Sequence, residues 1–171
     1  MSFKSIIDSI AQGASSIHLT EEWSQGRASF GGLVAAVVYQ AMLKVLDDDR
    51  PVRSLQISFV GPVSVNEPLE LETEVLRQGK SVSQVLGRGV QNGQTFVTII
   101  GSFGHRRDSM VKVTDPQFIF EEQPESIKAM PFMPGMTPNF TQFFDYRYCT
   151  QLPFTGSKDT ALKGFVRFKD E

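Results

Sequence analysis

Cysteine and histidine are scarce in this 171-residue sequence, and their scarcity excludes several kinds of protein. Cys149 is the single cysteine, so an internal disulfide is impossible. The two histidines, His18 and His105, have no Cys, His or acidic partner at the spacing of metal ligands. The first residues also lack the basic, apolar and small-residue regions of a signal peptide. We therefore expect a cytoplasmic protein that holds no metal and no other cofactor.

An excess of basic charge and a long apolar run are also missing. Lys and Arg number 17 against 19 Asp and Glu, and the formal net charge is −2. The densest basic cluster, His105-Arg106-Arg107, is more typical of a solvated loop than of a phosphate track, so we expect no nucleic-acid partner. The apolar segment at residues 33–46 is shorter than the about 20 residues of a membrane span, and Asp47-Asp48-Asp49 ends it at the surface. No membrane span is expected.

The sequence is organised around residues 27–46. From Leu33 onward this segment is apolar on nearly every side, which predicts a helix buried around most of its circumference. Ser29 is a candidate N-cap, and Gly31 and Gly32 would let a backbone or a ligand approach the unpaired N–H groups of the first turn. The segment contains no carboxylate and no histidine, so it offers no general base.

After Pro51, apolar and polar residues alternate for about 50 positions, as expected of strands. The predicted strands lie at residues 54–59, 69–75, 81–91 and 95–103, and an Asn92-Gly93 turn joins the last two in a tight hairpin. The residues expected to face the helix are Leu55, Ile57, Phe59, Leu69 and Leu71. The glycines expected where the sheet curves or is approached closely are Gly87, Gly89 and Gly101. The predicted fold is α+β, with a curved antiparallel sheet wrapped around one central apolar helix.

The flanking segments complete the prediction. The spacing of apolar residues predicts an amphipathic helix at residues 3–10, and alternation predicts a strand at residues 17–23. Residues 105–142 are rich in Pro, Met and Phe without a sustained period, so we expect a connector that packs down on a surface. Alternation returns at residues 143–149 and 163–169, which predicts two short strands. The expected domain boundaries are therefore 1–104, 105–142 and 143–171.

Several short segments follow one another in the order and spacing of a known family. They are 28–32 (Ala-Ser-Phe-Gly-Gly), 54–59, 77–81 (Arg-Gln-Gly-Lys-Ser), 91–96 and 101–103 (Gly-Ser-Phe). Together they resemble the N-terminal hot-dog domain of acyl-CoA thioesterases of the thioesterase II type, over about residues 17–104. The family carries two hot-dog units in one chain, and residues 144–147 and 164–168 resemble the opening strands of the second unit. The resemblance implies that this sequence ends before the central helix of that unit.

The resemblance also implies an activity, the hydrolysis of an acyl-CoA thioester. In the family, a water molecule attacks the thioester carbonyl with help from an Asp, a Thr or Ser, and a Gln of the second unit, at positions expected past Glu171. No catalytic residue is therefore identified here, and we expect the chain alone to be inactive. The backbone N–H groups of Phe30, Gly31 and Gly32 are candidates for an oxyanion hole, although close helix-to-sheet packing is the better explanation of the glycines.

Gly79, Lys80 and Ser81 are the other candidate substrate-binding residues. They match the end of a phosphate-binding loop, but Glu74 stands where its first glycine should be and the segment joins two strands, so we expect a hairpin.

Three functions remain open: a thioesterase whose catalytic half lies beyond this sequence, a non-catalytic acyl-binding or scaffold hot-dog module, and a hot-dog hydratase. The hydratase is the weakest, because hydratases of that fold resemble each other in an Asp and His pair that the predicted helix lacks. The expected partners are acyl-CoA and either a second copy of the chain or a second hot-dog unit. A lone two-stranded hairpin is marginal in water, so we expect association through strand edges and Phe144, Tyr146 and Phe165.

Overall fold

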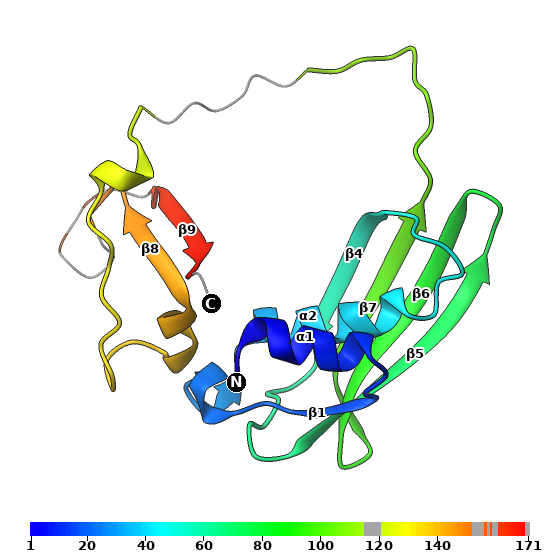
Figure 1. The fold of residues 1–171 in the computed structure, drawn as a ribbon, viewed down its shortest axis with the longest axis horizontal. Helices are drawn as coiled ribbons and strands as arrows, with labels where there is room; N and C mark the ends of the chain where they lie inside the picture. Colours follow the sequence, from blue (N-terminus) through cyan, green and yellow to red (C-terminus); the bar gives the residue numbers. More distant parts are fainter. Residues whose placement is uncertain (115–120, 152–155, 157, 159–160, 170–171) are drawn as a thin grey trace. The chain divides into compact units, whose positions relative to one another are not determined.

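The computed structural model describes residues 1–114, 121–151, 156, 158 and 161–169 (Figure 1). It divides into two compact units, Met1–Asp108 and Ser109–Glu171, and each is described by itself. The first unit contains an antiparallel sheet and two α-helices among its described residues. The second contains a two-stranded sheet and short 3-10 turns.

The sheet of the first unit has five strands in the order β1–β5–β6–β7–β4, and every neighbouring pair is antiparallel. The strands are β1 (Ser16–His18), β4 (Val52–Phe59), β5 (Pro68–Gln78), β6 (Val82–Gln91) and β7 (Gln94–Gly104). Asn92 and Gly93 have φ angles of 50° and 74°, as the tight turn between β6 and β7 requires. The four strands after Pro51 and this hairpin confirm the prediction from the sequence.

Helix α2 (Gly31–Leu43) lies across one face of this sheet, and α1 (Phe3–Ala11) packs beside it (Figure 1). Every residue of α2 from Leu33 onward is buried or half-buried. Ile6 and Ile10 of α1 are fully buried, which confirms the amphipathic helix predicted there. The observed architecture is the α+β arrangement of a sheet wrapped around one apolar helix.

Glycines in β6 and β7 bring α2 close to the sheet. A Cβ atom built on Gly87 would lie 2.7 Å from both Met42 Cγ and Val38 Cγ1, and one on Gly101 would lie 2.8 Å from Met42 Cε. Because real Cβ atoms do not approach that closely, larger residues at these positions would push the helix away. The element that approaches the sheet closely at these glycines, as predicted, is therefore helix α2.

Strand β4 differs from the prediction in burial. Its apolar residues share the helix-side face, because Leu55, Ile57 and Phe59 pair with Gly101, Ile99 and Val97 of β7. Yet these three side chains are 39%, 39% and 56% exposed, whereas Leu69 and Leu71 of β5 are 0% and 9% exposed. The predicted face is therefore correct, but burial is incomplete because β4 is at the outer edge of the sheet, where α2 covers it only in part.

Two predictions about the approach to α2 are also wrong. Residues 17–23 do not form one strand: β1 ends at His18, and η1 (Glu21–Trp23) is a 3-10 turn that buries Trp23 against Phe3, with ring centroids 6.3 Å apart. The N-cap of α2 is Phe30 rather than Ser29. Ser29 belongs to β3 (Ala28–Ser29), which pairs with β2 (Ser24–Gln25) and so holds Ser29 in a strand.

The helix also ends earlier than the predicted Leu46. After Leu43 the chain continues in tighter turns, in which the N–H of Lys44 donates to the carbonyl of Ala41 at 3.2 Å.

The loop between β4 and β5 is fixed by Gln91, which is 1% exposed. Its side-chain amide accepts from the N–H of Ser64 at 2.9 Å and donates to the carbonyls of Ser64 and Glu67 at 3.0 and 3.1 Å.

In the second unit, β8 (Phe144–Tyr148) and β9 (Gly164–Phe168) form an antiparallel pair, as predicted. Two 3-10 turns precede them, η2 (Pro124–Ser126) and η3 (Asn139–Phe143). The ring of Phe144 lies 4.5 Å from that of Phe168.

The described part of the predicted connector is packed in some places and exposed in others: Phe140 is buried, and Met130 and Phe132 are half-buried. Met110, Val111, Val113 and Met136 are 103%, 76%, 82% and 79% exposed. Residues 105–114 have no regular secondary structure, so they offer no periodic apolar face that a core could cover. Part of the predicted connector, residues 115–120, lies outside the described residues.

Candidate functional site

The start of α2 is the first candidate site. The N–H of Phe30 donates to the carbonyl of Trp23 at 2.8 Å, so it is not available as an oxyanion donor. Gly31 and Gly32 occupy the first turn, and their N–H groups have no acceptor among the described residues. Two of the three predicted donors therefore remain, at the positive end of the helix dipole.

Two phenyl rings lie against these glycines. A Cβ atom on Gly32 would lie 2.5 Å from the Phe30 ring, and one on Gly31 would lie 3.2 Å from the Phe59 ring. The contacts of these rings therefore support the explanation that Gly31 and Gly32 are glycines because larger side chains would not fit there. The same rings make the surroundings of the free N–H groups apolar, which suits an acyl thioester better than a charged group.

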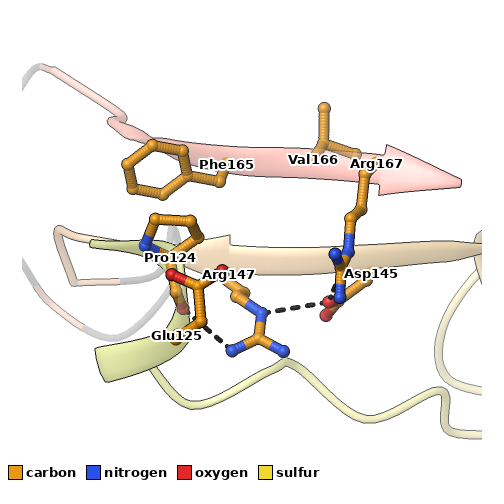
Figure 2. Close-up of a pocket in the computed structure, with 7 residues that line it drawn as sticks. All are labelled: Pro124, Glu125, Asp145, Arg147, Phe165, Val166 and Arg167. Atoms are coloured by element: carbon orange, nitrogen blue, oxygen red, sulfur yellow. Dashed lines mark hydrogen bonds and ion pairs between the residues drawn. The ribbon is translucent and has the colours of Figure 1, made fainter. Parts of the chain in front are cut away.

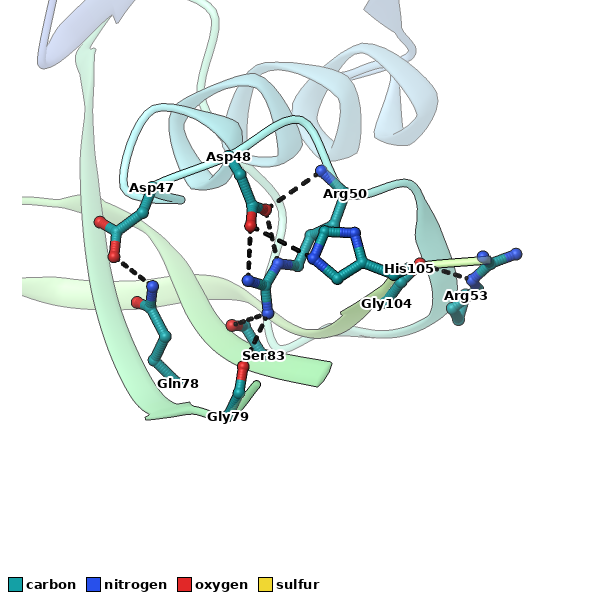
Figure 3. A network of polar contacts seen from close by, with 9 residues as sticks. All are labelled: Asp47, Asp48, Arg50, Arg53, Gln78, Gly79, Ser83, Gly104 and His105. Carbon is teal, nitrogen blue, oxygen red and sulfur yellow. Dashed lines mark hydrogen bonds and ion pairs between the residues drawn. The ribbon is translucent and has the colours of Figure 1, made fainter. Parts of the chain in front are cut away.

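Gly79, Lys80 and Ser81 lie elsewhere, in the hairpin between β5 and β6. This hairpin is close to the segment that follows α2, because Asp47 accepts a hydrogen bond from the side chain of Gln78 (Figure 3). The 13 residues of α2 span about 20 Å. The structure therefore does not bring the two sets of predicted site residues together.

The side chain of Arg50 holds the hairpin through contacts with Gly79 and Ser83 (Figure 3). It is 6% exposed, and its Nε and Nη2 donate to the carboxylate of Asp48 at 2.5 and 2.6 Å. Its Nη1 donates to the carbonyl of Gly79 at 3.1 Å and to Ser83 Oγ at 2.9 Å. Arg50 was not predicted as a site residue from the sequence, where its position between three aspartates and a proline was the available signal.

Asp48 is held in its ionised form by this contact. The hydrogen bonds from Arg50 lower the pKa of Asp48 from its ordinary 3.8 to about 2. His105 Nε2 also lies 3.4 Å from Asp48 Oδ2. A carboxylate with so low a pKa is a weak base, so these residues position the hairpin and do not supply general base catalysis.

The depressed pKa of Asp48 predicts a pH-dependent contribution to stability. The ion pair should stabilise the fold fully above pH 3.8 and lose its effect as the pH falls through about 2. We expect Asp48→Asn to melt at a lower temperature than the wild type at neutral pH, with the difference shrinking below pH 3.8. Circular dichroism melts across this range measure it. Asp49→Asn, at an exposed carboxylate, is the control, and a pH-independent difference for Asp48→Asn would contradict the assignment.

A cavity of 430 Å³ lies beside the hairpin. Its lining residues are Arg77, Gly79, Lys80, Ser81, Val82, Gln84 and Arg107. The predicted residues Gly79, Lys80 and Ser81 are therefore brought together in one cavity, along with two arginines that the sequence analysis did not place there. Arg107 was assigned to a solvated loop, and no local pattern linked it to the hairpin.

A smaller cavity, of 170 Å³, lies in the second unit (Figure 2). Asp145 accepts hydrogen bonds from Arg147 Nε at 3.0 Å and from Arg167 Nε at 3.4 Å. Arg147 also donates to the carbonyls of Pro124 and Ile127, at 2.8 and 2.9 Å. The hydrogen bond from Arg147 lowers the pKa of Asp145, so this carboxylate is engaged in joining η2 to β8 and is poorly suited to accept a proton.

Within the described part of the chain, no helix is both long and apolar enough to cross a membrane. The same residues contain no group of three or more His, Cys, Asp or Glu side chains able to hold a metal ion.

Comparison with known proteins places this geometry in a family. Residues 19–104 match the family model of the acyl-CoA thioesterase N-terminal domain. Over 77 residues the chain is 30% identical to acyl-CoA thioesterase 2 of Haemophilus influenzae. The matched segment is 45% of this chain and 27% of that protein.

Solved structures show the same fold. A hot-dog protein of unknown function from Alicyclobacillus acidocaldarius is similar with a TM-score of 0.78 and 20% identity, over 90% of this chain and 56% of that one. Acyl-CoA thioesterase II TesB2 from Mycobacterium marinum is similar with a TM-score of 0.68 and 19% identity. That match covers 91% of this chain and 55% of the other. The chain thus spans about half the length of these structures. These likenesses confirm the predicted hot-dog fold, and the family match shows that the chain belongs to the acyl-CoA thioesterase N-terminal domain family.

Proposed function

We propose that this chain is the N-terminal hot-dog half of an acyl-CoA thioesterase, and that residues of a second hot-dog unit complete the active site. Acyl-CoA and water would give the free acid and coenzyme A. Family membership supports the reaction class, and the lengths of similar structures support a second unit. The proposal that a second unit supplies the catalytic residues rests on one observation: α2 offers free N–H groups but no acidic residue and no histidine.

The chemistry of thioester hydrolysis explains why both parts are needed. The oxygen of water attacks the carbonyl carbon, the C–S bond breaks, and the departing thiolate takes up a proton. Free N–H groups such as those of Gly31 and Gly32 can stabilise the negative charge that forms on the carbonyl oxygen. The attacking water must also lose a proton to a base, and α2 has none to offer. A base from another hot-dog unit is therefore part of the proposal.

The outer edge of β4 supports the association that this requires. Among the described strands β4 pairs with β7 alone, so the N–H and C=O groups of its other edge have no partner strand. Leu55, Ile57 and Phe59 leave the helix-side face of the same strand apolar and exposed. We propose that this edge meets another hot-dog unit, or a second copy of the chain where that unit is absent.

The second candidate function is a non-catalytic acyl-binding or scaffold module. The absence of an acid–base group from α2 favours it. It differs from the first in one measurable respect, because it predicts acyl-CoA binding without turnover even when a second hot-dog unit is present.

The 171-residue chain alone is expected to hydrolyse acyl-CoA no faster than buffer. General acid–base help is typically worth about 10² to 10⁴-fold, and this chain would lack it. Release of free thiol from short-, medium- and long-chain acyl-CoA measures the rate. Acyl-CoA binding, measured in parallel by equilibrium dialysis, separates an inactive chain from an unfolded one. Turnover that a substitution within residues 1–171 abolishes would refute the proposal.

A further inference from the structure

We propose that the cavity beside the β5–β6 hairpin binds the phosphate groups at the nucleotide end of coenzyme A. The chemistry that it recognises is a phosphate monoester or diphosphate. The identity of the ligand as coenzyme A rests on the proposed function, whereas the preference for a phosphorylated anion rests on the cavity itself.

Three cationic side chains from separate segments converge on this cavity. Arg77 is near the end of β5, Lys80 is in the hairpin, and Arg107 follows β7. Two contacts hold these segments together. The N–H of His105 donates to the carbonyl of Ser81 at 3.1 Å, and Arg50 holds the carbonyl of Gly79.

These three cations have no ion pair or hydrogen bond among the described residues. Asp108, which follows Arg107, does not line the cavity, and four other acidic side chains are engaged elsewhere. Asp48 binds Arg50 and Asp47 binds Gln78. Glu72 and Glu74 lie 3.7 and 3.9 Å from Arg88. Three unpaired positive charges around one cavity repel one another, and the fold gains nothing from that repulsion. An anion with more than one negative charge would relieve it.

The shape and the other lining residues fit such a ligand. The volume of 430 Å³ is within the range of small-molecule sites. The hydroxyl of Ser81 and the amide of Gln84 can donate hydrogen bonds to phosphate oxygens. Gln84 is exposed while its neighbours Ser83 and Val85 are buried on the helix side, so the cavity opens on the other face of the sheet. A ligand can therefore enter without displacing α2.

The test is direct binding of adenosine 3′,5′-bisphosphate, coenzyme A and inorganic pyrophosphate to the 171-residue chain, by isothermal titration calorimetry. We expect the bisphosphate and coenzyme A to bind, and high salt to weaken both. Arg77→Gln, Lys80→Gln and Arg107→Gln should each weaken binding about fivefold or more, since charged hydrogen bonds at a partly exposed site are lost. Arg27→Gln, which removes an exposed charge near the start of α2, should leave binding unchanged.

Melting temperatures distinguish a binding role from a structural one. Removal of one of three repelling charges should leave the melting temperature unchanged or raise it, and Lys80→Arg should retain binding. Absence of bisphosphate binding, or equal weakening by Arg27→Gln, would overturn the site. Pyrophosphate binding as tight as that of the bisphosphate would overturn the nucleotide assignment. No readout in this test depends on turnover, so an inactive chain does not contradict the phosphate site. Thioester hydrolysis without bisphosphate binding would overturn the phosphate site and leave the proposed thioesterase function intact.

Discussion

Replacing Gly87 by leucine is expected to lower the free energy of unfolding of the first unit by about 3 kcal/mol, at the upper end of overpacking costs. The first added atom alone would lie 2.7 Å from Met42 Cγ and from Val38 Cγ1. Both of these residues are fully buried in α2, so neither can move without shifting the helix. Urea unfolding followed by circular dichroism measures the loss.

A double variant separates overpacking from a general weakness of β6. Met42→Ala removes Cγ and Sδ, two of the three atoms nearest to a Cβ at Gly87, and leaves Val38 Cγ1 in place. The two losses should therefore sum to more than the loss in the double variant. Strictly additive losses would show that the close approach of α2 to β6 is not the cause.

Ile57→Lys is expected to weaken association at the β4 edge about tenfold or more, because the association would have to desolvate an ammonium group at an apolar contact. Ile57 is already 39% exposed in the isolated unit, so the change should cost little folding stability. Analytical ultracentrifugation over a range of concentrations measures the dissociation constant.

Gln56→Lys is the matched control for this edge. It adds the same charge at the adjacent position of β4, on the opposite face, and should leave association nearly unchanged. A wild-type chain that stays monomeric at high concentration would contradict the proposed association. Association that Ile57→Lys does not weaken would place the contact elsewhere, for example on the aromatic residues of β8 and β9.

Most of the fold could be predicted from the periodicity of apolar residues. That periodicity shows on which face of a strand a side chain lies, but not whether another element covers that face. Leu55 and Leu69 have the same alternating pattern, and both lie on the helix-side face. Leu69 is buried because β5 lies inside the sheet, between β1 and β6. Leu55 is exposed because the order of the strands puts β4 at the edge, and that order depends on pairings distant in sequence.

The candidate sites were less predictable for the same reason. The sequence indicated Gly31 and Gly32 because a glycine pair at the start of an apolar helix is a local pattern. It could not indicate that the N–H of Phe30 is already engaged by Trp23, since that bond depends on how η1 turns. Nor could it join Arg107 to the hairpin, because that proximity depends on the pairing of β6 with β7 and on one main-chain hydrogen bond beyond their ends.

The position of β4 beside β7 also has a consequence for synthesis on the ribosome. The hairpins of β5, β6 and β7 close through short turns, whereas the partner of Val52 is Phe103, which is translated 51 residues later. Strand pairs so distant in sequence form slowly, because a long loop must close first. β4 leaves the exit tunnel well before its partner does, with apolar residues on one face. Like α2 before it, β4 therefore stays without its cover until the later strands are made, and it is a segment of the nascent chain that a chaperone or a neighbouring nascent chain can bind.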